Sequence, residues 1–144
     1  MTTQTYMHDI EETAAPFTGG VRGTPKALLR LEGLAAMALA ALAFARVGGS
    51  WPMFAVLFLA PDLSTLGYLA GRRFGAAAYN AAHSYLGPAV VGAFGVALSS
   101  PIAVQVALIW VAHVGFDRAL GYGLKYPTAF GDTHLGRIGK AKRS

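Results

Sequence analysis

The chain has 144 residues, of which 54% are hydrophobic and 13% are charged. A single soluble domain of this length cannot bury so much apolar surface, so we expect lipid to cover much of it. The net charge is +5, but the basic residues flank apolar stretches instead of alternating with aromatic residues, which argues against nucleic acid and favours membrane lipid as the partner. The absence of cysteine excludes disulfides, thiolate metal sites and a cysteine nucleophile.

The first part of the chain, residues 1–24, predicts a mobile polar tail on the cytoplasmic side, because it is rich in Thr, Gly and Pro and has no periodicity. A small-residue pattern ending at Ala45 resembles a signal-peptide cleavage site. Such a leader would begin with acidic residues and carry Arg30 and Glu32 in its apolar region, so we expect the segment to be retained.

Four apolar stretches follow, each close to the ~20 residues that a helix needs to cross ~30 Å of hydrocarbon. Thr24 and Pro25 suit the start of the first helix, as N-cap and first residue. The connections are very short, so consecutive helices should be antiparallel neighbours. The predicted fold is therefore all-α, an antiparallel four-helix transmembrane bundle over residues 25–121, with spans at about 27–45, 51–70, 76–98 and 102–120.

The basic residues predict how this bundle is oriented. Among the 12 Lys and Arg residues, Arg46 alone falls on the opposite side of the predicted spans. Short flanks rich in Lys and Arg stay in the cytoplasm, so we expect a multi-pass protein of the cell inner membrane with both termini cytoplasmic. Residues 122–144 are not apolar enough to span, and we expect an interfacial segment with aromatic rings at headgroup depth and the basic end, Lys140–Arg143, on anionic lipid.

Several ionisable groups lie inside the predicted spans, where each costs about 2.5 to 3.5 kcal/mol unless it has a partner or a wet cavity. His113 and Asp117 are four residues apart and share one helix face, as do Asn80 and His83 at a spacing of three. Pro61 and Pro88 interrupt helical hydrogen bonding close to these positions. The pattern predicts a polar pocket that opens toward the cytoplasm, formed by Asp62, His83, His113 and Asp117 and lined by Glu32, Ser64, Asn80, Tyr85 and Arg118.

Three chemical interpretations of this pocket remain open. In the leading one, His83 or His113 acts as a general acid/base oriented by Asp62 or Asp117, without metal or other cofactor, on a lipophilic or amphipathic small molecule. The same four residues would be the ligands of a divalent metal, but the sequence lacks the His-x-x-x-His or Glu-x-x-His repetition of stronger metal sites. In the third, the charges only fix helix register, with Asp117 paired to Arg118 or Arg30 and Glu32 paired to Arg30.

Glycines at a spacing of four, Gly67, Gly71 and Gly75, predict close helix packing at the end of the second span, either within the chain or in a homo-oligomer. Four spans are few for a transporter. A transporter or proton relay would therefore need oligomerisation through these glycines, and a structural assembly factor is the remaining alternative.

Several motifs give the chain a family resemblance. They are Leu28-Leu29-Arg30-Leu31-Glu32-Gly33, Pro61-Asp62-Leu63-Ser64, Tyr79-Asn80-x-x-His83-x-Tyr85, His113-x-Gly115-x-Asp117-Arg118-x-x-Gly121-Tyr122-Gly123-Leu124-Lys125-Tyr126 and Thr133-His134-Leu135-Gly136. Together they cover most of the chain outside its tails and resemble a family of small bacterial integral membrane proteins classed as a domain of unknown function. The resemblance implies a four-helix membrane protein and lends weight to the motif positions, but it transfers no activity and no catalytic residues.

Overall fold

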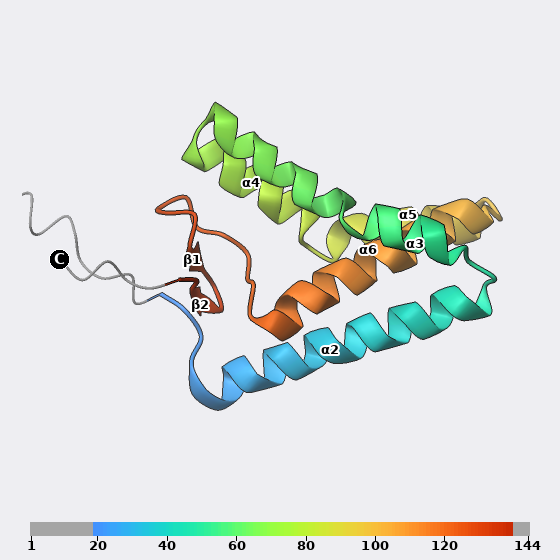
Figure 1. Ribbon diagram of the computed structural model, residues 1–144, viewed down its shortest axis with the longest axis horizontal. Helices are drawn as coiled ribbons and strands as arrows, with labels where there is room; N and C mark the ends of the chain where they lie inside the picture. Colours follow the sequence, from blue (N-terminus) through green and yellow to red (C-terminus); the bar gives the residue numbers. More distant parts are fainter. Residues whose placement is uncertain (1–18, 140–144) are drawn as a thin grey trace, which may run out of the picture.

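A computed structural model of the chain describes residues 19–139 (Figure 1). Most of the predicted tail and the basic end Lys140–Arg143 lie outside the described residues. The described elements are the helices α2 (Gly23–Arg46), α3 (Trp51–Phe58), η1 (Ala60–Ala70), α4 (Arg72–Ala82), α5 (Leu86–Ala97) and α6 (Pro101–Leu120), followed by the strands β1 (Asp132–Thr133) and β2 (Gly136–Arg137). The predicted all-α class with four helical segments is confirmed: α2, α3 with η1, α4 with α5, and α6.

Helix α6 is the centre of the fold, because α2, α3 and α5 all pack against it. The contact with α2 is the most extensive, and two glycines make it possible. A Cβ on Gly115 would lie 2.6 Å from the carbonyl oxygen of Gly33, and a Cβ on Gly33 would lie 2.8 Å from the carbonyl oxygen of Gly115. Only residues without a side chain allow two helix backbones to approach this closely.

The second and third predicted spans are not regular α-helices. After α3 the chain continues as the 3₁₀ helix η1, since Pro61 has no N–H for an α-helical bond and Asp62 N–H bonds to the Leu59 carbonyl three residues back. The third predicted span is divided into α4 and α5 at residues 83–85, with 11 and 12 residues respectively. Each of these two helices is too short to cross a bilayer alone at 1.5 Å per residue.

Within residues 19–139, three helical stretches are long and apolar enough to cross a membrane: Gly23–Arg46, Trp51–Ala70 and Pro101–Leu120. Large apolar side chains such as Leu39 and Leu69 lie exposed on these helices, at 66% and 89% of their full area. The start of α2, the turn between η1 and α4, and the end of α6 lie toward the same end of the molecule (Figure 1). The basic residues next to these ends therefore gather there, whereas Arg46 ends α2 at the other extreme.

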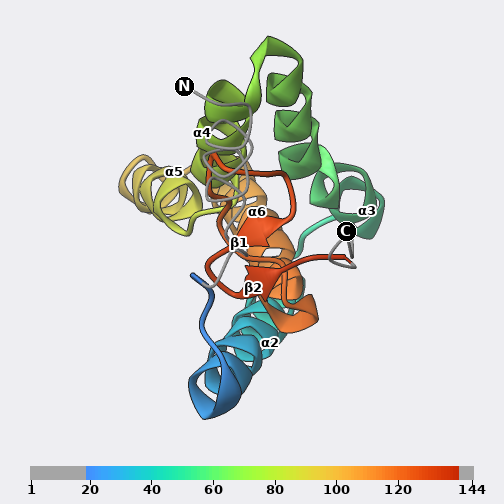
Figure 2. The same cartoon turned by 90° about the vertical axis from the view of Figure 1, so that its left-hand side faces the viewer.

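Residues 121–139, which we call the C-terminal segment, fold back between the η1–α4 hairpin and α2 (Figures 1 and 2). β1 and β2 pair antiparallel, and Lys125 bridges to Thr133. The segment is packed against the helices, since Thr133 and Leu135 are fully buried.

Candidate functional site

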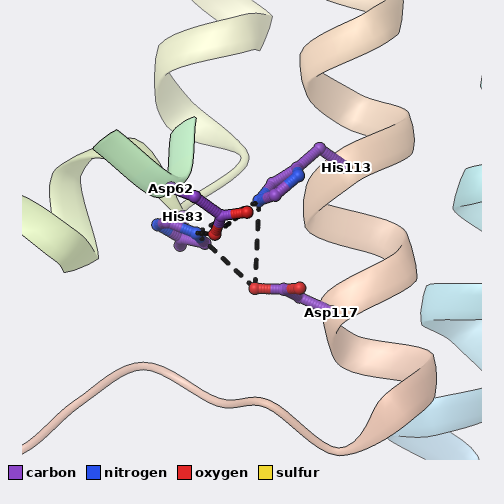
Figure 3. Close-up of side chains that lie close together, drawn as sticks. All are labelled: Asp62, His83, His113 and Asp117. Carbon is purple, nitrogen blue, oxygen red and sulfur yellow. Dashed lines mark hydrogen bonds and ion pairs between the residues drawn. The ribbon is translucent and has the colours of Figure 1, made fainter. Parts of the chain in front are cut away.

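Four side chains from three helical elements converge on one point (Figure 3). His83 Nε2 lies 3.1 Å from His113 Nε2, 3.4 Å from Asp62 Oδ1 and 3.5 Å from Asp117 Oδ2. His113 Nε2 lies 3.6 Å from Asp62 Oδ1 and 3.9 Å from Asp117 Oδ2. All four atoms lie within 4.8 Å of one another. The sequence named these four residues as the chemical centre, and the fold brings them together; we call them the histidine–aspartate cluster.

Local backbone structure explains how each member reaches the cluster. Asp62 lies in the first turn of η1, directly after Pro61. His83 is the C-cap of α4, and its N–H still bonds to the Tyr79 carbonyl, so its side chain leaves the helix at the break before α5. His113 and Asp117 are one turn apart on the buried part of α6.

Tyr79 holds two members of the cluster in place. Its carbonyl accepts a hydrogen bond of 2.9 Å from His83 Nδ1, and its hydroxyl donates a 3.1 Å bond to Asp117 Oδ2. Its ring stacks on the His83 ring, with centroids 3.7 Å apart and planes 9° from parallel. Because a carbonyl can only accept, Nδ1 of His83 carries the proton, and the Nε2 of a neutral His83 presents a lone pair to the cluster.

The helix break beside His83 leaves two backbone carbonyls without helical donors, and side chains of α6 satisfy both. Trp110 Nε1 donates to the Ala82 carbonyl at 2.5 Å, and Arg118 Nη2 donates to the His83 carbonyl at 2.8 Å. Broken helices are tolerated at membrane depth when neighbouring side chains supply such bonds. Arg118 also donates to the Tyr122 carbonyl, and Arg30, the other arginine expected to pair with Asp117, donates to the Ala119 carbonyl. In the described residues, both arginines therefore bond to backbone carbonyls. Asp117 instead contacts the two histidines of the cluster and the hydroxyl of Tyr79.

The remaining predicted pocket residues lie outside the cluster. Asn80 faces the C-terminal segment, where its side chain donates to the Lys125 carbonyl at 2.9 Å and accepts from Lys125 N–H at 2.7 Å. Glu32, Tyr85 and Arg118 line a separate pocket of about 150 Å³ together with His134. The residues expected to line one pocket are thus distributed over separate places in the structure.

Ser64 lines an apolar pocket of about 280 Å³ next to the cluster, and its Oγ is buried without a hydrogen-bond partner among the described residues. This pocket is close to the cluster in sequence and space: Pro61 precedes Asp62, Ala82 precedes His83, and Ile109 lies one turn before His113. The other lining residues are Leu57, Ala60, Val106 and Trp110. An apolar chamber therefore adjoins a polar, titratable cluster.

Lys125 was not singled out as a site residue from the sequence, yet it is 6% exposed and lies beneath Tyr79. Its Nζ is 4.6 Å from the Tyr79 ring centroid and 3.6 Å from that of Phe130, and it donates to the Phe130 carbonyl at 2.8 Å. Burial lowers the pKa of Lys125 below its ordinary value, while the negative charge of Asp117 acts in the opposite direction. Its place in the motif ending Leu124-Lys125-Tyr126 was the available sequence signal, but the motif did not indicate a contact with Tyr79, because only the return of the chain brings the two residues together.

The burial of the cluster is uneven. His83 and His113 have side-chain exposures of 0% and 2%, and Asp117 has 11%, whereas the Asp62 side chain is 50% exposed. Asp62 is therefore the most accessible member of the cluster.

These features define the class of the protein: an α-helical chain with three helices, within residues 19–139, that are long and apolar enough to cross a membrane, and with a histidine–aspartate cluster at a helix break. Residues 26–138 match the family described as a domain of unknown function (DUF4260), and the chain belongs to this family. No curated protein and no solved structure matches the chain.

Proposed function

We propose that this chain is an integral membrane protein that binds one divalent metal ion, most simply Zn²⁺, at Asp62, His83, His113 and Asp117. The observation that carries this proposal is the convergence of four ligand atoms. Ligands held tetrahedrally at the ~2.0–2.1 Å of Zn–N and Zn–O bonds are separated by about 3.3 Å. Five of the six separations within the cluster lie between 3.1 and 3.9 Å.

The charge of the cluster supports a cation. Two ionised carboxylates and two neutral imidazoles carry a charge of about −2, which is costly in an apolar surrounding unless it is compensated. Arg118 does not supply the compensation by direct bonding, since its guanidinium bonds to the carbonyls of Tyr122 and His83. One divalent ion would bring the cluster to neutrality.

The hydrogen bond from His83 Nδ1 to the Tyr79 carbonyl is also what a metal ligand requires. Ligating histidines commonly donate their second ring N–H to a carbonyl or carboxylate, which fixes the tautomer and the ring orientation. The hydroxyl of Tyr79 orients Asp117 in the same way.

A metal ion in this cluster would supply Lewis-acid chemistry, polarising a carbonyl or phosphoryl oxygen or lowering the pKa of a bound water to about 7. The half-exposed Asp62 gives access, and the adjoining apolar pocket suits the hydrocarbon part of an amphipathic substrate. The gathering of basic residues at one end favours a multi-pass arrangement in the inner membrane, with that end and both termini in the cytoplasm. The cluster then lies in the cytoplasmic half of the bundle.

The metal content of purified protein tests the proposal. Wild-type protein loaded with Zn²⁺, then freed of excess by gel filtration, should retain about one ion per chain by elemental analysis. His113→Ala and Asp117→Asn should retain little, whereas His134→Ala, a histidine outside the cluster, should behave as wild type. Equal retention by all variants, or none by wild type, would overturn the proposal.

Metal-free acid/base catalysis by the same residues is the second candidate function, and the 3.1 Å separation between the two Nε2 atoms favours it. At that distance the imidazoles would share a proton and pass it to a lipophilic substrate, with Asp62 or Asp117 as orienting group. Absence of metal retention together with histidine NMR signals that titrate as a linked pair would select this function.

An oligomeric transporter, proton relay or assembly factor is supported less directly. Gly67 and Gly75 are used inside the chain, since a Cβ on Gly67 would lie 2.9 Å from Ala78 Cβ and one on Gly75 would overlap the Tyr68 ring. Gly71 has open space around it. A homo-oligomer through these glycines would therefore use Gly71 and the outer face of the hairpin.

A further inference from the structure

We propose that a second, basic pocket at the start of α2 and the end of α6 binds the phosphoryl group of an anionic amphiphile. The pocket has a volume of about 210 Å³ and contains Lys26, Arg30 and Arg137, with Leu120, Gly121, Tyr122 and Ile138. The three cations come from α2 and β2 and are brought together only when the C-terminal segment folds back. This site is independent of the proposed metal centre.

The protein neutralises only part of the positive charge of the pocket among the described residues. Among residues 19–139, the ion pair involving these cations is Arg137 Nε to Asp132 Oδ1 at 3.0 Å. Arg30 uses Nε for the Ala119 carbonyl, which occupies one of the five N–H donors of a guanidinium. Lys26 Nζ lies beside Gly136, 3.3 Å from where a Cβ would stand, so a side chain at that position would crowd the ammonium group.

A helix C-terminus carries partial negative charge, and donors of the protein offset part of it at α6. Three carbonyls of its last turn are already occupied. The Asp117 carbonyl accepts from Tyr122 N–H, that of Arg118 from Gly121 N–H, and that of Ala119 from Arg30. The pocket therefore has donors in excess of acceptors, as a phosphoryl group requires.

Apolar surface next to the pocket favours a lipid over a free ion. Leu120 belongs to the lining and is 51% exposed, and the same turns of α2 expose Leu28 and Leu31 at 54% and 60%. A phosphoryl headgroup in the pocket would leave its acyl chains along these leucines. Basic residues near a membrane surface each contribute about 1 kcal/mol to the binding of an anionic lipid.

Titrations of the detergent-purified full chain with dioleoyl phosphatidic acid, dioleoyl phosphatidylcholine and inorganic phosphate, each in EDTA, test this inference. EDTA removes divalent metal, so phosphate cannot bind through a metal ion in the cluster. A negative result in this experiment is therefore separate from a negative result for the metal proposal. Wild type should bind phosphatidic acid, monitored by native mass spectrometry, and Lys26→Gln should bind it about fivefold more weakly, as the loss of ~1 kcal/mol gives. Lys26→Arg should retain binding.

Arg73→Gln is the matched control, since Arg73 lies at the η1–α4 turn, toward the same end of the molecule but outside the pocket. It should bind as wild type. Competition by inorganic phosphate would identify a free phosphate as the source of the group, and lack of competition would identify the lipid. Equal weakening in Lys26→Gln and Arg73→Gln, or equal binding of phosphatidylcholine, would overturn the inference.

Discussion

Tyr79 and His83 form a double contact at the end of α4: their rings stack at 3.7 Å, and the Tyr79 carbonyl accepts a hydrogen bond from the Nδ1–H of His83. The same tyrosine reaches Asp117 through its hydroxyl. One residue of α4 thus sets the tautomer of the histidine that caps this helix and the orientation of a carboxylate on α6. Loss of this tyrosine hydroxyl should alter the cluster without removing any of its four members.

We expect Tyr79→Phe to weaken Zn²⁺ binding by about tenfold, because groups that orient metal ligands commonly contribute 10- to 100-fold in affinity. The phenylalanine ring still stacks on His83, so the fold should be retained. Competition with a chromophoric chelator measures the affinity. Tyr122→Phe is the control, because Tyr122 contacts Asp117 through its backbone N–H, which the substitution leaves in place. An unchanged affinity in Tyr79→Phe would show that the hydroxyl does not orient Asp117.

The double variant Asp62→Asn/Asp117→Asn should separate the effect of the two negative charges on stability from the effect of bound metal. In EDTA we expect it to unfold at a higher temperature than wild type, since it removes two negative charges from an apolar surrounding. Saturating Zn²⁺, at 100 times Kd, should stabilise wild type by about 2.7 kcal/mol and leave the double variant unchanged. Thermal unfolding in detergent monitors both effects.

Asp132→Asn is the matched control for that experiment, because Asp132 pairs with Arg137 outside the cluster. It should lose stability in EDTA and still respond to Zn²⁺. A double variant that is less stable than wild type in EDTA would mean that the two carboxylates stabilise the metal-free fold.

The docking of the C-terminal segment should depend on pH through His134. Burial, assisted by the positive charge of Arg118, lowers the pKa of His134 from 6.5. Glu32 and Tyr85 face it in the same pocket. Because the pKa of His134 is lower in the folded state, the unfolded chain binds the proton more readily as the pH falls. The contribution of neutral His134 to the stability of the fold is therefore present above pH ~6.5 and is lost as the pH falls through the folded-state pKa.

Protonation would also break the bond in which His134 Nδ1 accepts from Leu124 N–H at 2.8 Å. Hydrogen exchange at the Leu124 amide should therefore be less protected at pH 5.5 than at pH 7.5, after correction for intrinsic rates. His134→Asn keeps a neutral acceptor that does not titrate, and its protection should not change between these values. A pH effect of equal size in both proteins would assign it to another group.

Asn80 should determine how firmly the C-terminal segment is held. Asn80→Ala removes both bonds to the Lys125 backbone and leaves those groups partly buried, which costs roughly 1 to 3 kcal/mol. We expect faster tryptic cleavage after Lys125. Asn80→Asp keeps an acceptor for the Lys125 N–H and should be cleaved at an intermediate rate; cleavage of both variants at the wild-type rate would contradict this role.

The sequence predicted the cluster because burying a charge is costly whatever the neighbours are. Asp62, His83, His113 and Asp117 stood out as ionisable residues in apolar stretches, and the one-turn spacing of His113 and Asp117 placed both on one face of α6. The division of the wider pocket was not predicted. Glu32 and Tyr85 were equally conspicuous, but spacing along a helix does not say which side of a neighbouring helix a residue meets.

Only the tertiary structure shows what four further residues contribute, namely Tyr79, Lys125 and the pair Gly33 and Gly115. Tyr79 lies four residues before His83, a spacing that allows contact but does not distinguish stacking from exposure to lipid. Lys125 reaches Tyr79 only because the C-terminal segment returns between the hairpin and α2. Gly33 lacked the regular spacing of Gly67, Gly71 and Gly75, although a side chain at this position would overlap α6.

The sequence by itself determined that the chain is helical, apolar enough to enter a membrane, and in possession of four costly ionisable residues, because hydropathy and helical spacing are local properties. The tertiary structure decided that these four residues meet within 4.8 Å, that Arg118 bonds to carbonyls in place of Asp117, and that three cations surround a second pocket. These are contacts between residues that are far apart in the chain. The break between α4 and α5 and the return of the C-terminal segment create them.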